Sequence, residues 1–263
     1  SYRSSSLLSE ENSFPTIKVN ETVVTEENKD DILGGQNAGV LSYNEATNTL
    51  KSNGSIMGNL TIDAPGVNIV LDNPNGPVVF GKLTVTNAAS VKATSKYSLA
   101  VFDAVEISCD GEVEITSGES YAVAGGVTVK QASKVAISGK SNGNIVTYDV
   151  KIECPVPVTI RNNGTGGMAR SINYSGGKYV YSDTENGPRV DPDTPINAKA
   201  SAVYITPVVA RTITLTHATV DVPDNKAYAG QTVTVTPDDR TAEGYQFVRW
   251  EVVSGIADAE LIR

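Results

Sequence analysis

The sequence is poor in the residues that build metal and redox sites. Its 263 residues include two cysteines, one histidine and one tryptophan. With no Cys-x-x-Cys pair and one histidine, a zinc site is not expected. The sequence contains no strand-to-helix nucleophile elbow of the Gly-x-Ser-x-Gly type that would supply a catalytic serine for His217. We therefore interpret His217 as an exposed or half-buried strand residue rather than a catalytic base. We predict no catalytic residue, no metal ligand and no cofactor.

Basic clusters and long apolar runs are also missing. The chain has 21 Lys and Arg against 30 Asp and Glu, a net charge of −9. Nucleic-acid binding needs a basic stripe, so we do not expect a nucleic-acid partner. No run approaches the ~18 apolar residues of a membrane span, so membrane insertion is not expected either. The chain does not open on an apolar signal segment, so a secreted protein would be represented here by its mature part.

The sequence does contain a repeat, between residues 59 and 182. A short apolar pattern recurs every 22 or 23 residues, at Leu60-Thr-Ile62, Leu83-Thr-Val85, Val105-Glu-Ile107, Val127-Thr-Val129, Val150-Lys-Ile152 and Ile172-Asn-Tyr174. A second ladder runs through Ile69, Val91, Val113, Val135 and Val158. A third runs through Val79, Val101, Val123, Thr147 and Ala169, with one coil stretched by residues 141–144.

Three short strands per repeat, joined by small polar corners, are typical of a parallel β-helix. A β-sandwich also has short strands at even spacing, but it does not require the same residue type at the same place every 22 residues. We therefore predict an all-β fold: a single-stranded, right-handed parallel β-helix with an N-terminal hairpin cap, plus a small C-terminal β domain.

Composition along the chain suggests four segments. Residues 1–13 are polar and read as a flexible leader. Residues 14–182 form the capped β-helix, with the hairpins between Thr16 and Leu50 as its N-terminal cap. Residues 183–198 hold three prolines and are typical of an interdomain linker. Residues 199–263 are predicted to form the small β domain.

The start of the β-helix resembles a known family. Ile17-Lys-Val-Asn20, Asp31-Ile-Leu-Gly34 and Leu41-Ser-Tyr43 with the following turn, then Asn59-Leu-Thr-Ile62, look like the opening of bacterial surface β-helix proteins of the carbohydrate-binding-domain type. The likeness covers about residues 16–182, and the family's frequent Trp in the first strand is absent. The resemblance implies a β-helix and a carbohydrate ligand.

The C-terminal part resembles a different module. Tyr228-Ala-Gly-Gln-Thr-Val-Thr-Val-Thr-Pro237, followed by Glu243-Gly-Tyr-Gln-Phe-Val-Arg-Trp250, is similar to the internalin-type B-repeat of bacterial surface proteins. It covers some 40 residues and implies a secreted or cell-surface context. We interpret Tyr245, Phe247 and Trp250 as core residues in preference to a ligand site, because alternating aromatics beside a glycine turn usually pack inside.

The repeat also predicts the state of Cys109 and Cys154. Each follows its ladder residue by two positions, and one full coil lies between them. Two rungs at ~4.8 Å separate them by ~9.6 Å, beyond the ~7 Å reach of a disulfide. We expect two free, mostly buried thiols.

Candidate site residues follow from the same ladder. Glycosidic cleavage needs two carboxyl groups at ~5–9.5 Å, and no convincing pair can be built on adjacent rungs. One column, just before the third corner, is rich in aromatics: Phe80, Phe102, Ala124, Tyr148 and Arg170. If it points outward it offers a ribbon of ring faces for glycan binding, and if the alternation is reversed the rings pack inside.

The functional expectation is therefore ranked. First comes a non-catalytic secreted or cell-surface protein, monomeric, that binds a polysaccharide or a host or cell-surface glycan or mediates adhesion through Phe80, Phe102, Tyr148 and Arg170. The alternative is a polysaccharide lyase or glycoside hydrolase of the β-helix type, and only a lyase would bring in calcium. A purely structural stalk ranks third.

Overall fold

The computed structural model describes residues 15–187, 194–227 and 232–249. The chain forms two compact units, one ending at Pro207 and one beginning at Val208. Within the described ranges, no helix has the length and apolar character needed to cross a membrane.

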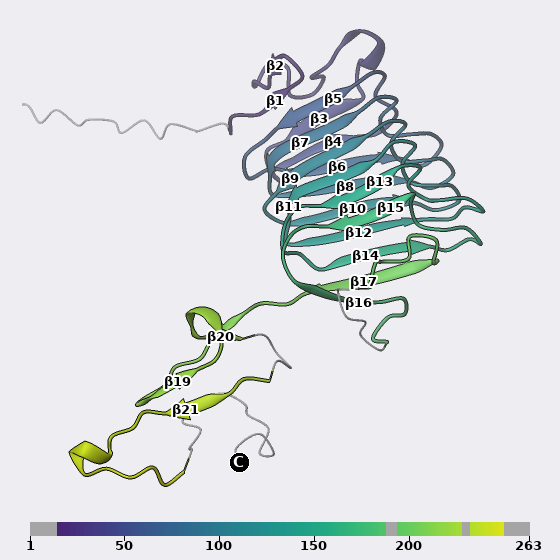
Figure 1. Ribbon diagram of the computed structural model, residues 1–263. Helices are drawn as coiled ribbons and strands as arrows, with labels where there is room; N and C mark the ends of the chain where they lie inside the picture. The colour runs from purple at the N-terminus through teal and green to yellow at the C-terminus, as the bar shows by residue number, and fades with distance from the viewer. Residues whose placement is uncertain (1–14, 188–193, 228–231, 250–263) are drawn as a thin grey trace, which may run out of the picture. The chain divides into compact units, whose positions relative to one another are not determined.

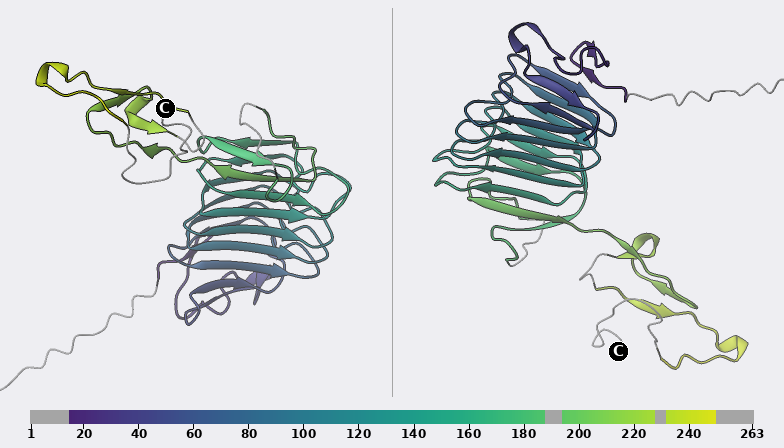
Figure 2. Two further views of the ribbon diagram at one scale, coloured as in Figure 1. Left: turned by 90° about the horizontal axis from the view of Figure 1, so that it is seen from below. Right: turned by 180° about the vertical axis from the view of Figure 1, so that it is seen from behind.

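The first unit is a β-solenoid of about six turns, as the repeat predicts (Figure 1). One sheet stacks six parallel strands: β5 (Leu60–Asp63), β7 (Leu83–Ala88), β9 (Val105–Cys109), β11 (Val127–Gln131), β13 (Asp149–Ile152) and β15 (Ser171–Tyr174). The other stacks β4 (Thr49–Ser52), β6 (Asn68–Asn73), β8 (Ser90–Ser95), β10 (Glu112–Ser117), β12 (Lys134–Gly139) and β14 (Val158–Asn162). The views in Figure 2 show the same stack of coils from two further sides.

Alternation of side chains explains why these segments stack. In β5 Leu60 and Ile62 are fully buried while Thr61 is exposed. The first two predicted ladders are confirmed, since Leu60 pairs with Leu83 and Ile69 with Val91, and the pairing continues coil by coil. The outward-facing residues of the same strands, each between two ladder residues, are Thr61, Thr84, Glu106, Thr128, Lys151 and Asn173.

The third ladder needs one correction. Single bridges join Ile56, Val79, Val101, Val123 and Val146 in parallel. Val146 is buried, and Thr147, which the sequence prediction placed on this ladder, is exposed. The stretched coil therefore places the ladder residue one position earlier than predicted.

Buried polar side chains hold the corners that follow the second sheet. Ser95 and Ser117 are almost fully buried, and each accepts a backbone N–H three residues ahead, from Ser98 and Ser120. On a later coil Asn162, 4% exposed, makes four hydrogen bonds to backbone groups of the loops around it. These side chains satisfy N–H and C=O groups that a sharp corner would otherwise leave unpaired inside the protein.

The N-terminal end is capped by hairpins, as predicted. β1 (Lys18–Val19) and β2 (Thr22–Val23) form one hairpin, and β1 also pairs antiparallel with β5. β3 (Leu41–Asn44) pairs antiparallel with β4. Ile17, Val19 and Leu41 are fully buried, so the cap covers the end of the core. A short 3-10 helix, η1 (Gly35–Asn37), lies between the two hairpins in sequence.

The C-terminal end is closed by a strand that the sequence prediction assigned to the next domain. β17 (Ala202–Pro207) lies antiparallel between β14 and β16 (Tyr179–Ser182). Its Val203 and Ile205 are buried in the core of the solenoid. Residues 183–198 therefore connect two strands of the same unit, and the boundary between the units falls at 207–208 instead of within a linker at 183–198. The predicted leader, residues 1–13, lies outside the described residues.

The second unit contains two small strand pairs in its described part. β18 (Arg211–Thr212) pairs with β20 (Lys226–Ala227), and β19 (Ala218–Val220) pairs with β21 (Val235–Pro237). Two 3-10 helices, η2 (Pro223–Asn225) and η3 (Thr241–Glu243), lie in the connections.

Two sequence interpretations change in the second unit. His217 is exposed, as expected, but it lies in the bend before β19 with a left-handed φ of 55° instead of in a strand. Tyr245 and Phe247 are 60% and 51% exposed, so they do not form the predicted core. Arg240 packs over the Tyr245 ring, 4.5 Å from its centroid. Trp250, the third predicted core residue, lies outside the described residues.

Candidate functional site

An exposed apolar ridge crosses three neighbouring coils of the solenoid. Met57, Phe80 and Phe102 are 42%, 39% and 52% exposed, and each directly follows a fully buried residue of the third ladder. The Phe80 and Phe102 rings stack with centroids 5.9 Å apart and planes 30° apart. The predicted column therefore points outward at these two residues, which leaves two large apolar rings in solvent.

The backbone fixes this outward direction. The Phe80 N–H donates to Ile56 O (2.9 Å) and the Phe102 N–H donates to Val79 O (3.0 Å). Because side chains alternate along an extended segment, burial of Val79 and Val101 turns the next residue outward. Sequence reasoning missed Met57, although the spacing could have found it: Ile56 precedes Val79 by one repeat, so Met57 occupies the place of Phe80.

Further along the ridge the register differs from the prediction. The N–H groups of Ala124 and Thr147 continue the pattern of Phe80 and Phe102, donating to Val101 O and Val123 O. Thr147 therefore takes the column position that the prediction gave to Tyr148. Tyr148 lies one residue later, where its N–H donates to Gly125 O (3.2 Å), and its side chain is 51% exposed. The ridge thus has a gap at Ala124 between the phenylalanine pair and Tyr148.

The Arg170 side chain contacts the Tyr148 ring and is also hydrogen-bonded to a carboxylate. Its guanidinium lies 5.2 Å from the centroid of the Tyr148 ring. Its Nε and Nη2 donate to the two oxygens of Asp149 at 2.9 and 2.6 Å, and Ser171 Oγ donates to Asp149 Oδ1 at 2.8 Å. The hydrogen bonds from Arg170, then that from Ser171, hold the pKa of Asp149 at about 2. Arg170 is therefore a planar partner for Tyr148, with two of its five N–H donors engaged by Asp149.

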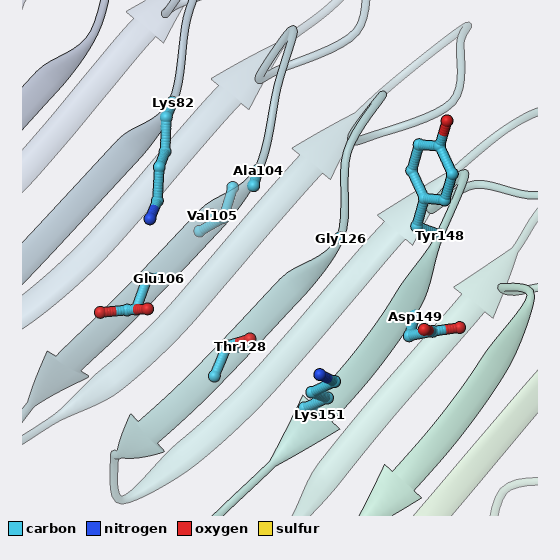
Figure 3. Close-up of a pocket in the computed structure, with 9 residues that line it drawn as sticks. All are labelled: Lys82, Ala104, Val105, Glu106, Gly126, Thr128, Tyr148, Asp149 and Lys151. Carbon is cyan, nitrogen blue, oxygen red and sulfur yellow. The ribbon is translucent and has the colours of Figure 1, made fainter.

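A shallow depression of about 190 Å³ lies beside the gap in the ridge. Figure 3 shows the nine residues that line it: Lys82, Ala104, Val105, Glu106, Gly126, Thr128, Tyr148, Asp149 and Lys151. Ala104 and Gly126 lie on consecutive coils, where the Val105 N–H donates to Gly126 O. Lys82 stands on the coil before them and Asp149 on the coil after. These four residues occupy the same place on four consecutive coils. The depression exists because the two in the middle, Ala104 and Gly126, are smaller than Lys82 and Asp149 at the ends.

The backbone approaches closely under this floor. A Cβ placed on Gly125 would come within 2.4 Å of Ala104 N, and one placed on Gly126 within 3.0 Å of Asp149 O. Gly125 therefore cannot carry a side chain without moving the neighbouring coil, and Gly126 has little room for one. These two glycines keep the coils in contact at the depression.

Charges around the depression are unevenly paired. Glu106 is bound by Lys130 at 3.0 Å, and this hydrogen bond holds the pKa of the Glu106 carboxyl below its usual range. Asp149 is bound by Arg170. In contrast, Lys82 and Lys151 have no carboxylate within ion-pair distance in the part of the chain that the structure describes. The two lysines are thus available as hydrogen-bond donors at opposite sides of the depression (Figure 3).

The cysteines are free and buried, as the repeat predicts. Burial raises the pKa of the Cys109 thiol to about 11 and also raises the pKa of Cys154. Among the described residues, no group of three or more His, Cys, Asp or Glu side chains is placed to hold a metal ion.

Comparison of the chain with protein-family models, with curated proteins and with solved structures finds no match. The carbohydrate-binding and internalin-type resemblances drawn from short motifs therefore remain predictions.

Proposed function

We propose that the chain is a non-catalytic glycan-binding protein of the secreted or cell-surface kind, and that the ridge and depression on the solenoid form its binding face. The observation that carries this proposal is the stacked, exposed pair Phe80–Phe102 on adjacent coils. An aromatic ring offers a flat apolar face with negative charge density, which attracts the weakly positive C–H groups of a sugar ring. Exposed apolar surface of this kind marks interaction sites.

Rigidity of the platform supports a binding role. The phenylalanines sit on backbone that is hydrogen-bonded to the coils on both sides, and their neighbours Val79 and Val101 are fully buried. The Arg170–Asp149 pair similarly holds a planar group over Tyr148. A preformed surface loses little conformational entropy when it binds, so modest contacts produce measurable affinity.

Four surface carboxylates of the solenoid are paired with cations, and this pairing favours binding over catalysis. Glu106, Glu114 and Glu119 each lie within ion-pair distance of a lysine on a neighbouring coil, at 3.0, 3.6 and 2.7 Å. Asp149 is engaged by Arg170 and Ser171. A general acid in glycoside hydrolysis needs a raised pKa, whereas the pKa values of Glu106 and Asp149 are lowered. The polysaccharide lyase or hydrolase therefore ranks second.

The cell context follows from the motif resemblances alone. Both point to bacterial surface proteins, so the proposed location is extracellular or at the cell surface. The proposed partner is a polysaccharide or a host or cell-surface glycan, bound by one copy of the chain.

The experiment begins with a glycan array and affinity electrophoresis of the full chain. We expect retention by at least one polysaccharide. Phe80→Ala, Phe102→Ala and Tyr148→Ala should each weaken binding by about two- to tenfold, the equivalent of ~0.5–1.5 kcal/mol per lost ring contact. Because these rings are exposed, the thermal unfolding midpoints should change little.

A matched control is available at Tyr97. This ring is 58% exposed and lies under the Lys96 ammonium, but it follows the second sheet and is not on the ridge. Tyr97→Ala should leave binding unchanged. The proposal fails if no glycan in a broad panel retains the chain, or if Tyr97→Ala weakens retention as much as Phe102→Ala. Release of new reducing ends or unsaturated uronides would establish the enzymatic alternative instead.

A further inference from the structure

The binding face has a direction that is set by the stacking of the coils. Phe80, Phe102, Ala124 and Tyr148 belong to four consecutive coils, and neighbouring coils are ~4.8 Å apart. A line through Phe80, Phe102 and Ala124 runs along the axis of the solenoid and crosses the strands, and Tyr148 lies on the fourth coil, one residue past this line. A ligand that contacts both the phenylalanine pair and Tyr148 must therefore be extended along that axis.

The depression lies beside the middle of this line. Its floor, Ala104 and Gly126, belongs to the same consecutive coils as Phe102 and Ala124. Its volume of about 190 Å³ is smaller than the ~300–1,000 Å³ of pockets that enclose a whole drug-sized ligand. The depression therefore has room for one unit of a longer molecule and not for the whole of it.

Polar groups surround this central position on several sides. Lys82 and Lys151 offer ammonium donors that have no carboxylate within ion-pair distance in the described chain, and Thr128 offers a hydroxyl. Ring faces lie on the same coils: Phe80 shares a coil with Lys82, Phe102 with Ala104, and Tyr148, which lines the depression, with Lys151. Apolar faces with interposed hydroxyl-binding groups match the two kinds of surface that a sugar ring presents.

We infer that the depression at Ala104 and Gly126 is the central subsite of a track along the solenoid axis, and that its ligand is a linear, unbranched glycan of about four rings, one per coil. This inference rests on the proposed glycan-binding function and adds to it the orientation, the length of the ligand and the residues that select it. Ala104 and Gly126 admit a sugar ring because they are small, and the ring takes the space that a longer side chain would fill.

The first test varies ligand length with the full-length protein. The probes are linear gluco-, xylo-, manno- and galacturono-oligosaccharides, from disaccharide to hexasaccharide, measured by isothermal titration calorimetry. For the series that binds, the dissociation constant should fall about two- to tenfold per added ring up to the tetrasaccharide and then level off. Phe102→Ala should lower the gain from the rings that reach the phenylalanine pair. Equal affinity for disaccharide and hexasaccharide would overturn the inference.

The second test fills the depression. Ala104→Leu should weaken tetrasaccharide binding at least about tenfold, because the added side chain occupies the central subsite. Ala136→Leu is the matched control: Ala136 is half-buried on the outer face of the other sheet, in register with Glu114 and Thr159. Circular dichroism and thermal unfolding of both variants show whether the fold is kept, and the length series on the unsubstituted protein tests the inference independently of either variant.

The outcomes separate this inference from the function on which it rests. If the unsubstituted chain binds none of the probes and no polysaccharide, both proposals fall. If it binds glycans but Ala104→Leu, correctly folded, binds as well as Ala136→Leu does, the axial track is wrong while glycan binding stands. Loss of binding in Ala104→Leu alone, together with the length dependence, supports the track.

Discussion

At the scale of single residues, Arg170 shows how neighbouring coils change what a side chain can do. Its sequence position suggested a ligand-binding cation, but its guanidinium donates to both oxygens of Asp149 and stacks on Tyr148. Asp149 and Arg170 are 21 residues apart in the sequence. The regular pairing of β13 with β15, Asp149 opposite Ser171, places Arg170 beside Tyr148, but the sequence alone does not show that the guanidinium turns toward Asp149.

This pairing predicts a measurable pKa. The Asp149 carboxyl should titrate at about 2, below its ordinary value of 3.8, because Arg170 and Ser171 stabilise the charged form. A lowered pKa in the folded state means that the stabilising contribution is complete above the ordinary value. It is lost as pH falls from about 4 to about 2. Carboxyl-detected NMR titration measures the Asp149 pKa directly.

Two substitutions identify the cause of the low pKa. Arg170→Gln should return the Asp149 pKa most of the way to its ordinary value, since Arg170 is the largest cause. Lys151→Gln should change it much less, because Lys151 contributes the smallest effect. An unshifted Asp149 in the unsubstituted protein would contradict the proposed role of Arg170 as a held planar partner.

At the scale of elements, the regular part of the solenoid could be predicted and the corners could not. The first two ladders follow from apolar residues that recur at 22 or 23 positions, since each must return to the same interior column. The third column has only one bridging residue per coil, so the extra residue in the stretched coil could be absorbed in several ways. The sequence prediction therefore puts Thr147 at the ladder position that Val146 occupies. For the same reason it puts Tyr148 at the column position that Thr147 occupies.

The corners depend on buried polar residues that no apolar pattern reveals. Asn162 accepts from Ser141 N and Gly164 N and donates to Gly143 O and Gly167 O, all within 3.0 Å. Replacing it with alanine removes all four hydrogen bonds and leaves a gap at the buried Asn162 position, although Gly167 O still accepts from Ile145 N. We expect Asn162→Ala to lower the free energy of unfolding by about 2–4 kcal/mol, as urea denaturation would measure it.

The adjacent asparagine is the control for this prediction. Asn163 is exposed, and its backbone N–H donates to Gly139 O. Asn163→Ala should change stability by no more than about 0.5 kcal/mol. Equal effects of the two substitutions would show that the Asn162 side chain does not hold the corner.

At the scale of the whole solenoid, the open ends decide the stability, because each coil needs a neighbour on both sides. The N-terminal cap was predictable, since its hairpins precede the repeat directly in sequence. The C-terminal cap was not. β17 returns to the solenoid after a proline-containing segment, and its alternating Val203 and Ile205 resemble any strand of a following domain. Only its antiparallel pairing with β14 and β16 assigns it to the first unit.

Two truncated chains test this assignment of the cap. A chain of residues 1–182 keeps all the predicted repeats but lacks β17, so β14 loses a neighbour and β16 loses the strand that pairs it to the sheet. A chain of residues 1–207 keeps the whole first unit. Loss of Val203 and Ile205 removes ~1.5–3 kcal/mol of stabilising free energy for each buried side chain. Exposure of the core beneath them adds to this loss. A domain stabilised by only ~5–15 kcal/mol cannot easily absorb that loss.

We therefore expect residues 1–207 to unfold cooperatively and to be monomeric by size-exclusion chromatography. Residues 1–182 should be aggregated or show no cooperative transition at 25 °C, because the edge of β14 and apolar core residues become exposed. Ile205→Asp in the full chain should act in the same direction by placing a charge in the core. Thr206→Asp, an exposed neighbour on the same strand, should be tolerated. Cooperative, monomeric unfolding of residues 1–182 would show that the solenoid ends before β17 and that this strand only rests against it.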